Sequence, residues 1–195
     1  MKKIITISRE FGSGGRSIGK AVAERLHYHY YDKELIEKIA EKSGLSKEYI
    51  EEKTESSKPE SSFKYAFLGP NLFHYSEDYL WKQQKEVILE LAETGNCVIM
   101  GRCADFLLKD REDCLHIYIY ADLSFKIERI VNLYGETDEK PEKRLRDKDK
   151  KRAMNYKYYT ERTWGMAKNY TISLNSSEIG IDKCVDIICD LAKNM

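Results

Sequence analysis

The chain has 195 residues with 33 basic and 33 acidic side chains, and its formal net charge is zero. This length is most simply one domain with a sizeable core, and the balanced charge lacks the strongly basic footprint of a duplex nucleic-acid binder. The first apolar run ends at Ser8, too short for a secretion signal, and no run approaches membrane-spanning length. We expect a cytoplasmic single-domain protein (1–195) without nucleic acid or membrane partners, and the sequence does not indicate its oligomeric state.

Strands and helices alternate along the first half of the chain. The apolar run 3–8 predicts a buried strand, and residues 16–26 predict a helix because Ile18, Val22 and Leu26 lie four apart on one face. The polar run ESSKPESS at 55–62 is the clearest loop. The remaining elements expected in this half are an extended piece over 30–32, a helix over 33–44 that ends near Gly44, and a short helix that starts at Ser46.

The second half continues the alternation. An amphipathic helix is expected over 76–95, closed by Gly95, and a strongly charged polar stretch follows residue 135. Strands that alternate with helices predict a parallel sheet covered on both faces. The other expected elements are strands over 97–100, 114–121 and 170–174 and helices over 122–135 and 180–194.

Cysteine and histidine patterns indicate neither a disulfide framework nor a metal site. The five cysteines are odd in number and form no C-x-x-C pair, so reduced thiols are expected. The four histidines show no ligand spacing typical of zinc. Cys103 has no histidine placed to activate it in the sequence, which favours packing over nucleophilic catalysis.

The most informative stretch is SREFGSGGRSIGK at 8–20, a glycine-rich loop between a strand and a helix. Such a loop presents backbone N–H groups to an anion at the helix N-terminus, and glycine permits the positive φ angles and close approach that this requires. The alternative is a glycine-rich turn without a ligand, which the flanking strand and helix disfavour. The predicted phosphate-binding residues are Gly12, Ser13, Gly14, Gly15, Arg16 and Ser17.

Two registers of the P-loop pattern G-x-x-x-x-G-K-[ST] remain open. Residues 10–17 fit it if Glu10 replaces the first glycine and Arg16 replaces the lysine; a second register puts Gly15 at the lysine position. In either register no lysine is present, so Arg16 or another basic residue must supply the charge. Ser17 is the candidate for the hydroxyl on the magnesium side.

Several motifs together resemble the cytidylate kinase-like proteins of the P-loop kinase superfamily. They are ITISREFGSGGRSIGKAVAERL, YYDKELI, VIMGRCADFLL, DKDKKRAMNYKYYTERTWG and NYTISLNSSEIGIDKCVDII, which together span nearly the whole chain. The resemblance implies a three-layer α/β P-loop kinase fold, with a five-stranded parallel sheet flanked by helices, an acceptor-side arm and a mobile basic lid at about 136–165. It also implies that ATP, with Mg²⁺, donates its γ-phosphoryl group to an acceptor phosphate or hydroxyl.

The run KRLRDKDKKR at 143–152 has seven basic residues in ten positions. Most runs of this kind form a solvated face, but the stretch also resembles the lid of cytidylate kinases. In that lid an Asp and an Arg three apart face donor and acceptor, as Asp149 and Arg152 are spaced here. The upstream lid arginine is either Arg144 or Arg146, and the catalytic candidates are Arg16, Arg152 and Arg146. The aromatic residues that follow are expected to pack the lid helix onto the core.

Acceptor-binding candidates follow two of the strands. Arg102 comes directly after strand 97–100, where open α/β sheets bind ligands. Cytidylate kinases have a similar G-R-D here, whereas this chain reads G-R-C and its nearest acid is Asp105; an internal salt bridge is the alternative role for Arg102. Asp32 resembles the acid that faces the acceptor, or is a plain helix N-cap. Asp149 is the fourth acceptor-binding candidate, beside Arg102, Asp105 and Asp32.

Three functions follow from these patterns. The first is phosphoryl transfer to a nucleoside monophosphate, with CMP or dCMP as the best candidate. The second is a kinase for another small metabolite, because the acceptor motif departs from G-R-D and the acceptor-side arm (43–75) is short. The third is a nucleotide-binding sensor with little turnover, because the P-loop lysine is missing.

Overall fold

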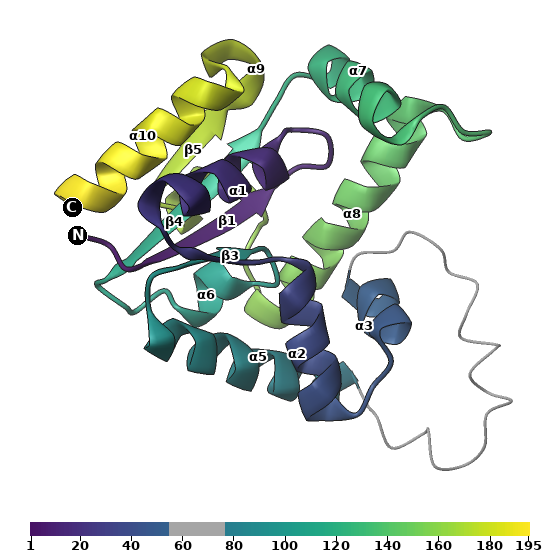
Figure 1. Ribbon diagram of the computed structural model, residues 1–195. Coiled ribbons are helices and arrows are strands. Elements are labelled where there is room, and N and C mark those ends of the chain that lie inside the picture. The colour runs from purple at the N-terminus through teal and green to yellow at the C-terminus, as the bar shows by residue number, and fades with distance from the viewer. Residues whose placement is uncertain (55–76) are drawn as a thin grey trace, which may run out of the picture.

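Five parallel strands form the centre of the computed structural model, which describes residues 1–54 and 77–195 (Figure 1). The strand order is β2-β3-β1-β4-β5, and every neighbouring pair is parallel. All carboxyl ends therefore meet at one edge of the sheet, and the predicted fold class is confirmed. The strands are β1 (Ile4–Arg9), β2 (His29–Tyr31), β3 (Cys97–Met100), β4 (Cys114–Tyr120) and β5 (Ile172–Asn175).

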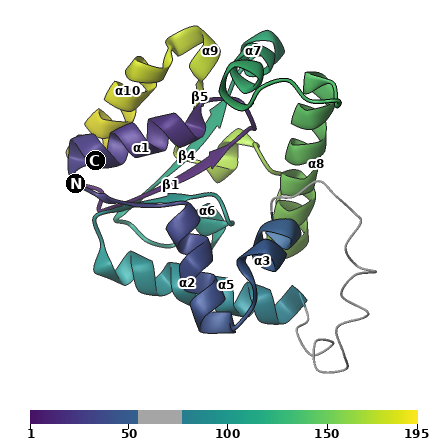
Figure 2. The ribbon, with the colours of Figure 1, turned by 45° about the vertical axis from the view of Figure 1, so that its right-hand side comes forward.

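Successive residues of β1 serve opposite faces of the sheet, because side chains alternate along a strand. Ile5 and Ile7 pack with α1 and α10 in one core, and Ile4 packs with the helices of the other core. Figure 2 shows the two helical layers with the sheet between them. One layer holds α1 (Gly15–Leu26), α9 (Ser176–Ile179) and α10 (Ile181–Asn194); the other holds α2 (Lys33–Ser43), α3 (Lys47–Thr54), α5 (Glu77–Thr94) and α6 (Ala104–Leu107).

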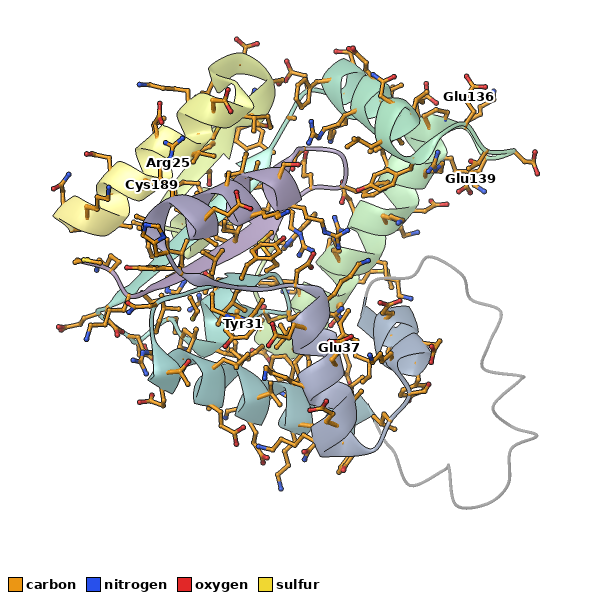
Figure 3. The ribbon with its side chains drawn as sticks, viewed as in Figure 1. Arg25, Tyr31, Glu37, Glu136, Glu139 and Cys189 are labelled. Carbon is orange, nitrogen blue, oxygen red and sulfur yellow. The ribbon has the colours of Figure 1, made fainter. Side chains whose placement is uncertain are left out.

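The charged stretch after residue 135 forms a long helix, α8 (Pro141–Thr160), which follows α7 (Leu123–Tyr134). Pro141 starts α8, as its fixed φ permits at the first helical position. The helix has no continuous apolar stripe, because its buried residues are Leu145, Tyr156 and Thr160, and periodicity therefore did not reveal it. Figure 3 shows Glu136 and Glu139 in the connection from α7 to α8, at the periphery of the molecule.

Aromatic side chains attach the end of α8 and the following segment to the core. The ring of Tyr159 stacks on Trp81 with centroids 4.3 Å apart, and Trp164 contacts Tyr118 edge-on at 5.5 Å. Tyr156 is 3% exposed. The predicted packing role of these aromatic residues is confirmed, whereas Tyr158 is exposed to solvent.

The structure adds to the predicted elements or shifts them in a few places. The last strand begins at Ile172 rather than at residue 170, and a short helix, α9, follows it because the Asn175 side chain accepts a hydrogen bond from the Ser177 N–H. The predicted loop 55–62 and most of the predicted arm 43–75 lie outside the described residues. Within the described ranges, no helix is long and apolar enough to cross a membrane. All five cysteines are buried, and none of them forms a disulfide.

Candidate functional site

The glycine-rich loop joins β1 to α1 at the carboxyl edge of the sheet. Gly12 and Gly14 adopt left-handed φ angles of +82° and +79°, and α1 begins at Gly15 without a side-chain cap from Gly14. Uncapped N–H groups at a helix N-terminus, together with the helix dipole, favour an anion. The loop thus has the backbone form that phosphate binding requires.

Packing requires glycine at two positions of the loop where phosphate binding would also require it. A Cβ on Gly12 would lie 3.0 Å from the Lys126 carbonyl oxygen, and one on Gly14 would lie 2.4 Å from Cδ1 of Ile181. Ser13 is buried, and its carbonyl oxygen accepts a 2.6 Å hydrogen bond from Oγ of Ser176. The loop is therefore held in shape by α7, α10 and α9 before any ligand binds.

A cavity of about 250 Å³ opens over the loop, and we call it the donor cavity. Six basic side chains and one acidic side chain are among the described residues that line it. Such an excess of positive charge suits a polyanion such as a nucleoside triphosphate. The lining consists of Arg9, Glu10, Phe11, Gly12, Gly14, Gly15, Arg16, Ser17, Arg129, Leu133, Tyr134, Arg144, Lys148 and Arg152.

Asp32 connects the loop to β2. Its Oδ2 atom lies 2.6 Å from Nε of Arg16, and its Oδ1 atom lies 3.5 Å from NH2 of Arg9. Asp32 precedes α2, but its side chain makes no capping hydrogen bond. Of the two roles open from the sequence, the structure does not show the side-chain N-cap, because the carboxylate pairs with Arg16 and Arg9 instead, and the role at the acceptor stays a prediction. Arg16 is half-exposed, lines the donor cavity and is turned toward Asp32.

Helix α7 contacts both ends of the loop. Nζ of Lys126 lies 2.7 Å from Oε2 of Glu10, the residue at the first P-loop glycine position. At the other end, NH2 of Arg129 donates a 2.7 Å hydrogen bond to Oγ of Ser17. A magnesium ion at Ser17 would replace this contact and would take its other ligands from phosphate oxygens and water, as Mg²⁺ commonly does. No group of three or more His, Cys, Asp or Glu side chains suited to a metal occurs in the described ranges.

Helix α8 contacts the loop through Asp149 and Arg152. Oδ1 of Asp149 accepts a 2.8 Å hydrogen bond from the Phe11 N–H, and NH1 of Arg152 lies 3.2 Å from the same oxygen. NH1 of Arg152 also lies 3.2 Å from the Arg9 carbonyl oxygen. Burial raises the pKa of Asp149 to about 6, against the opposing effect of Arg152. The structure therefore brings Asp149 to the donor loop.

The two candidates for the upstream lid arginine occupy different places. Arg144 lines the donor cavity together with Lys148. Arg146 is 71% exposed, its Nε atom lies 3.9 Å from Oδ1 of Asp147, and it is not among the described residues that line either cavity. The geometry thus brings Arg152 and Arg144 to the loop but leaves Arg146 apart.

A second cavity, of about 50 Å³, lies beyond the carboxyl ends of β1 and β3, and we call it the acceptor cavity. Gln84 of α5 is 4% exposed and donates from Nε2 to the Arg102 carbonyl oxygen at 3.1 Å. Its Oε1 atom is buried without a hydrogen-bond partner in the described part of the chain. The lining consists of Ser8, Arg9, Gln84, Gly101, Arg102, Cys103, Arg152, Asn155, Tyr156 and Trp164.

Asp105 lies behind this cavity rather than in it. Its carboxylate accepts hydrogen bonds from Oγ of Ser8 at 3.3 Å and from the Tyr156 hydroxyl at 2.6 Å, and both of these residues line the cavity. Burial raises its pKa. Burial also raises the pKa of the Cys103 thiol, which disfavours the thiolate and agrees with the predicted packing role.

Sequence reasoning missed several residues that line the two cavities or contact the donor loop. Lys126 and Arg129 lie three apart in the predicted helix 122–135, a spacing that puts both on one face and was an available signal. Arg9 was hidden at the end of a buried strand, and Gln84 lies on a helix whose partners are far away in the sequence. Other lining residues that were not predicted include Lys148, Asn155, Tyr156 and Trp164.

Comparisons with known proteins agree with this architecture. A family model described as the cytidylate kinase-like family matches residues 4–178. An uncharacterized protein from Eubacterium ventriosum superposes with a TM-score of 0.74 at 24% identity, covering 98% of this chain and 99% of that one. A shikimate kinase from Acinetobacter baumannii, in complex with shikimate, gives 0.56 at 17% identity, covering 98% and 93%. A gluconokinase from Sinorhizobium meliloti gives 0.55 at 17% identity, covering 99% and 95%.

No curated protein matches the sequence. The family model spans most of the chain, and the sheet order, the glycine-rich loop and the basic cavity over it agree with the family assignment. The chain therefore belongs to the cytidylate kinase-like family, and it shares its fold with a shikimate kinase and a gluconokinase.

Proposed function

We propose that this protein transfers the γ-phosphoryl group of ATP to a small acceptor bound beside Arg102. The supporting observation is that the donor and acceptor cavities meet at the carboxyl edge of the sheet and share two arginines, Arg9 and Arg152. Phosphoryl transfer is mainly positioning and charge neutralisation, so adjacent cavities with shared cations suit it. The absence of disulfides supports a reducing compartment, and we place the reaction in the cytoplasm.

ATP would bind with its phosphates against the amides of residues 12–17. Ser17 would hold Mg²⁺, which shields the phosphate charge when bound. Arg16 and Arg152 are the predicted catalytic residues, and Arg144 replaces Arg146 in this proposal because Arg144 lines the donor cavity. Asp149 keeps the loop and α8 in contact through the Phe11 N–H.

CMP or dCMP is the acceptor to test first, because the chain belongs to the cytidylate kinase-like family. Arg102 would bind its phosphate. Asp32 and Asp105 support this site indirectly, since Asp32 pairs with Arg9, and Asp105 orients Ser8 and Tyr156.

A different small metabolite is the second candidate. Position 103, where the G-R-D pattern has its acid, holds a buried cysteine, and the nearest carboxylate, Asp105, is already bonded to Ser8 and Tyr156. Solved structures of similar fold include a shikimate kinase and a gluconokinase, whose acceptors carry hydroxyl groups and a carboxylate. A hydroxyl donor on such an acceptor would meet Oε1 of Gln84.

The test is a coupled assay of ADP release with Mg–ATP against nucleoside monophosphates and small hydroxylated acids. Turnover with CMP or dCMP supports the first candidate, and turnover with another acceptor alone supports the second. Tight ATP binding without turnover on any acceptor supports a nucleotide sensor and contradicts the proposed transfer. Arg102→Ala should raise the acceptor KM and leave the ATP KM unchanged, with Lys20→Ala, an exposed change on α1, as the control.

A further inference from the structure

We propose that Arg9, at the end of β1, is the catalytic cation that binds the γ-phosphoryl group and takes the role of the missing P-loop lysine. This inference rests on the proposed function, because it assumes that ATP binds over the loop. It assigns a role to a residue outside the loop, whereas Arg16 is the replacement that the loop pattern predicts.

The position of Arg9 between the two cavities carries the argument. A phosphoryl group that leaves ATP for an acceptor must cross the boundary between the donor and acceptor cavities. Among the described residues, only Arg9 and Arg152 line both. Arg16 lines the donor cavity alone.

The fold makes room for the Arg9 side chain at two glycines. A Cβ on Gly15 would lie 2.5 Å from Cβ of Arg9, and a Cβ on Gly101 would lie 2.3 Å from its NH1 atom. The side chain therefore runs from the first turn of α1 across the end of β3 toward Asp32, whose Oδ1 atom is 3.5 Å from NH2. Glycine at positions 15 and 101 leaves room for this arginine, because any larger side chain there would overlap the side chain of Arg9.

Burial and charge distinguish Arg9 from Arg16. Arg9 is 7% exposed and Arg16 is 48% exposed, while a single carboxylate, Asp32, contacts both. A buried guanidinium is costly unless anions compensate it, and Asp32 compensates both guanidinium groups here. A γ-phosphate would supply further negative charge, and a cation in a dry site stabilises it more strongly than one in water.

The chemical step is a direct transfer. An oxygen of the acceptor forms a bond to the γ-phosphorus as the bond from phosphorus to the bridging oxygen breaks, and the electron pair of that bond leaves on ADP. A hydroxyl acceptor also loses its proton to solvent or to a base, whereas a phosphate acceptor has no proton to lose from the attacking oxygen. Arg9 would bind the equatorial oxygens through this transfer.

The experiment measures nucleotide binding, which does not depend on the acceptor. Calorimetry gives the Kd of Mg–ADP and of the Mg complex of an ATP analogue with an imido bridge between the β- and γ-phosphates. Arg9→Met removes the charge at similar volume, and Arg9→Lys retains it. Arg25→Met is the matched control: Arg25 forms an ion pair with Asp186, and Figure 3 shows it beside Cys189, between α1 and α10.

We expect Arg9→Met to lose about tenfold or more of the preference for the ATP analogue over ADP, and its ADP affinity to stay within about twofold. Arg9→Lys should recover part of this preference, and Arg25→Met should keep all of it. Thermal unfolding confirms that each variant folds. If Arg9→Met does not fold, Gly101→Ala displaces the guanidinium without removing it and should show the same loss of preference.

Two results would overturn the proposal. In the first, folded Arg9→Met or Gly101→Ala keeps the preference while Arg16→Met loses it, which assigns the γ-phosphate to Arg16. In the second, neither Arg9→Met nor Arg16→Met loses the preference for the ATP analogue, which assigns the γ-phosphate to the basic residues of α8. A wild-type protein that binds neither nucleotide contradicts the proposed function instead, so the two failures are distinct.

Discussion

The donor and acceptor cavities are built in different ways, although they share an edge of the sheet. The donor loop is one continuous segment, residues 10–17, and much of what it presents is backbone. The acceptor cavity takes its lining from β1, α5, the turn after β3, α8 and the segment that follows α8. A contiguous loop can be identified from its own residues, whereas a cavity of distant segments depends on how the chain folds. The backbone of the donor loop is therefore a local feature, whereas five of the six basic residues of the donor cavity, and the lining of the acceptor cavity, come together only in the fold.

The cavities also differ in charge. The donor cavity is dominated by cations, which suits a polyphosphate of any nucleotide. The acceptor cavity combines arginines with neutral hydrogen-bonding groups from Gln84, Asn155 and Tyr156. Cations attract many anions, whereas neutral groups with fixed donors and acceptors discriminate between them. Specificity should therefore reside on the acceptor side.

The largest expected effect comes from Gly14→Val in the donor loop. Gly14 has a φ of +79°, and a Cβ there would lie 2.4 Å from Cδ1 of Ile181 and 3.5 Å from Nε of Arg129, which lines the donor cavity. We expect the affinity for Mg–ATP to fall by about a hundredfold or more, measured by calorimetry. Gly44→Val is the matched control, because Gly44 has a φ of +71° but nothing within 4 Å of its Cβ position. Equal affinities in the two variants would contradict a phosphate-binding loop.

Arg152→Ala tests the boundary that the two cavities share. Arg152 lines both, so its guanidinium should act on charge that develops during transfer. We expect kcat to fall by about a hundredfold and the ATP KM to change by less than about threefold, in the ADP-release assay. Lys143→Ala, an exposed change on the same helix, is the control. Equal losses in kcat and in ATP binding would indicate that Arg152 anchors the bound substrate in the ground state. No loss in either would indicate that the charged run of α8 is only a solvated face.

Gln84→Leu tests the acceptor side alone. The change removes the unpartnered Oε1 atom and the hydrogen bond to the Arg102 carbonyl oxygen. We expect the KM for the acceptor found in the screen to rise about tenfold while the Kd for Mg–ATP is unchanged. Leu89→Ala, an exposed change on α5, is the control. A change in ATP affinity would mean that the two cavities are not separable in this way.

Asp149→Asn should have the smallest effect on activity, because Asn can still accept the hydrogen bond from the Phe11 N–H. We expect kcat within about threefold of the wild-type value at pH 8. The informative readout is stability against pH. Burial raises the pKa of Asp149 to about 6, so between its usual pKa and pH 6 the folded protein holds a proton that the unfolded chain has lost.

The free energy of unfolding of the wild type, relative to Asp149→Asn, should therefore fall as the pH rises from about 4 to 6 and level off above that. Urea denaturation of both variants across this range measures the difference. Glu10, Lys126 and Arg152 face Asp149 and are retained in the variant, so their effects largely cancel. A difference that rises with pH would show that the carboxylate is stabilised by its partners and not penalised by burial.

The sequence by itself was sufficient for the parallel α/β sheet and for the position of the donor loop. Apolar runs such as 3–8 and the spacing of Ile18, Val22 and Leu26 are local signals, because strand and helix periods are written into neighbouring residues. The family resemblance added the five-stranded sheet and the interpretation of the charged segment after residue 135 as a lid. Apolar periodicity did not give the bounds of this lid helix, α8, since only Leu145, Tyr156 and Thr160 of it are buried.

Tertiary structure alone decided which side chains meet. From the sequence Asp32 was either a helix cap or an acid facing the acceptor, and only the fold shows that it pairs with Arg9 and Arg16 at the edge of the sheet. From the sequence, Arg144 and Arg146 could not be distinguished as the upstream lid arginine. In the folded helix Arg144 lines the donor cavity, whereas Arg146 is exposed to solvent. Gln84 joined Arg102 only through the packing of α5 on the sheet. Periodicity is a property of neighbours in the chain, whereas the sharing of one carboxylate or one cavity by distant residues arises only once the chain has folded.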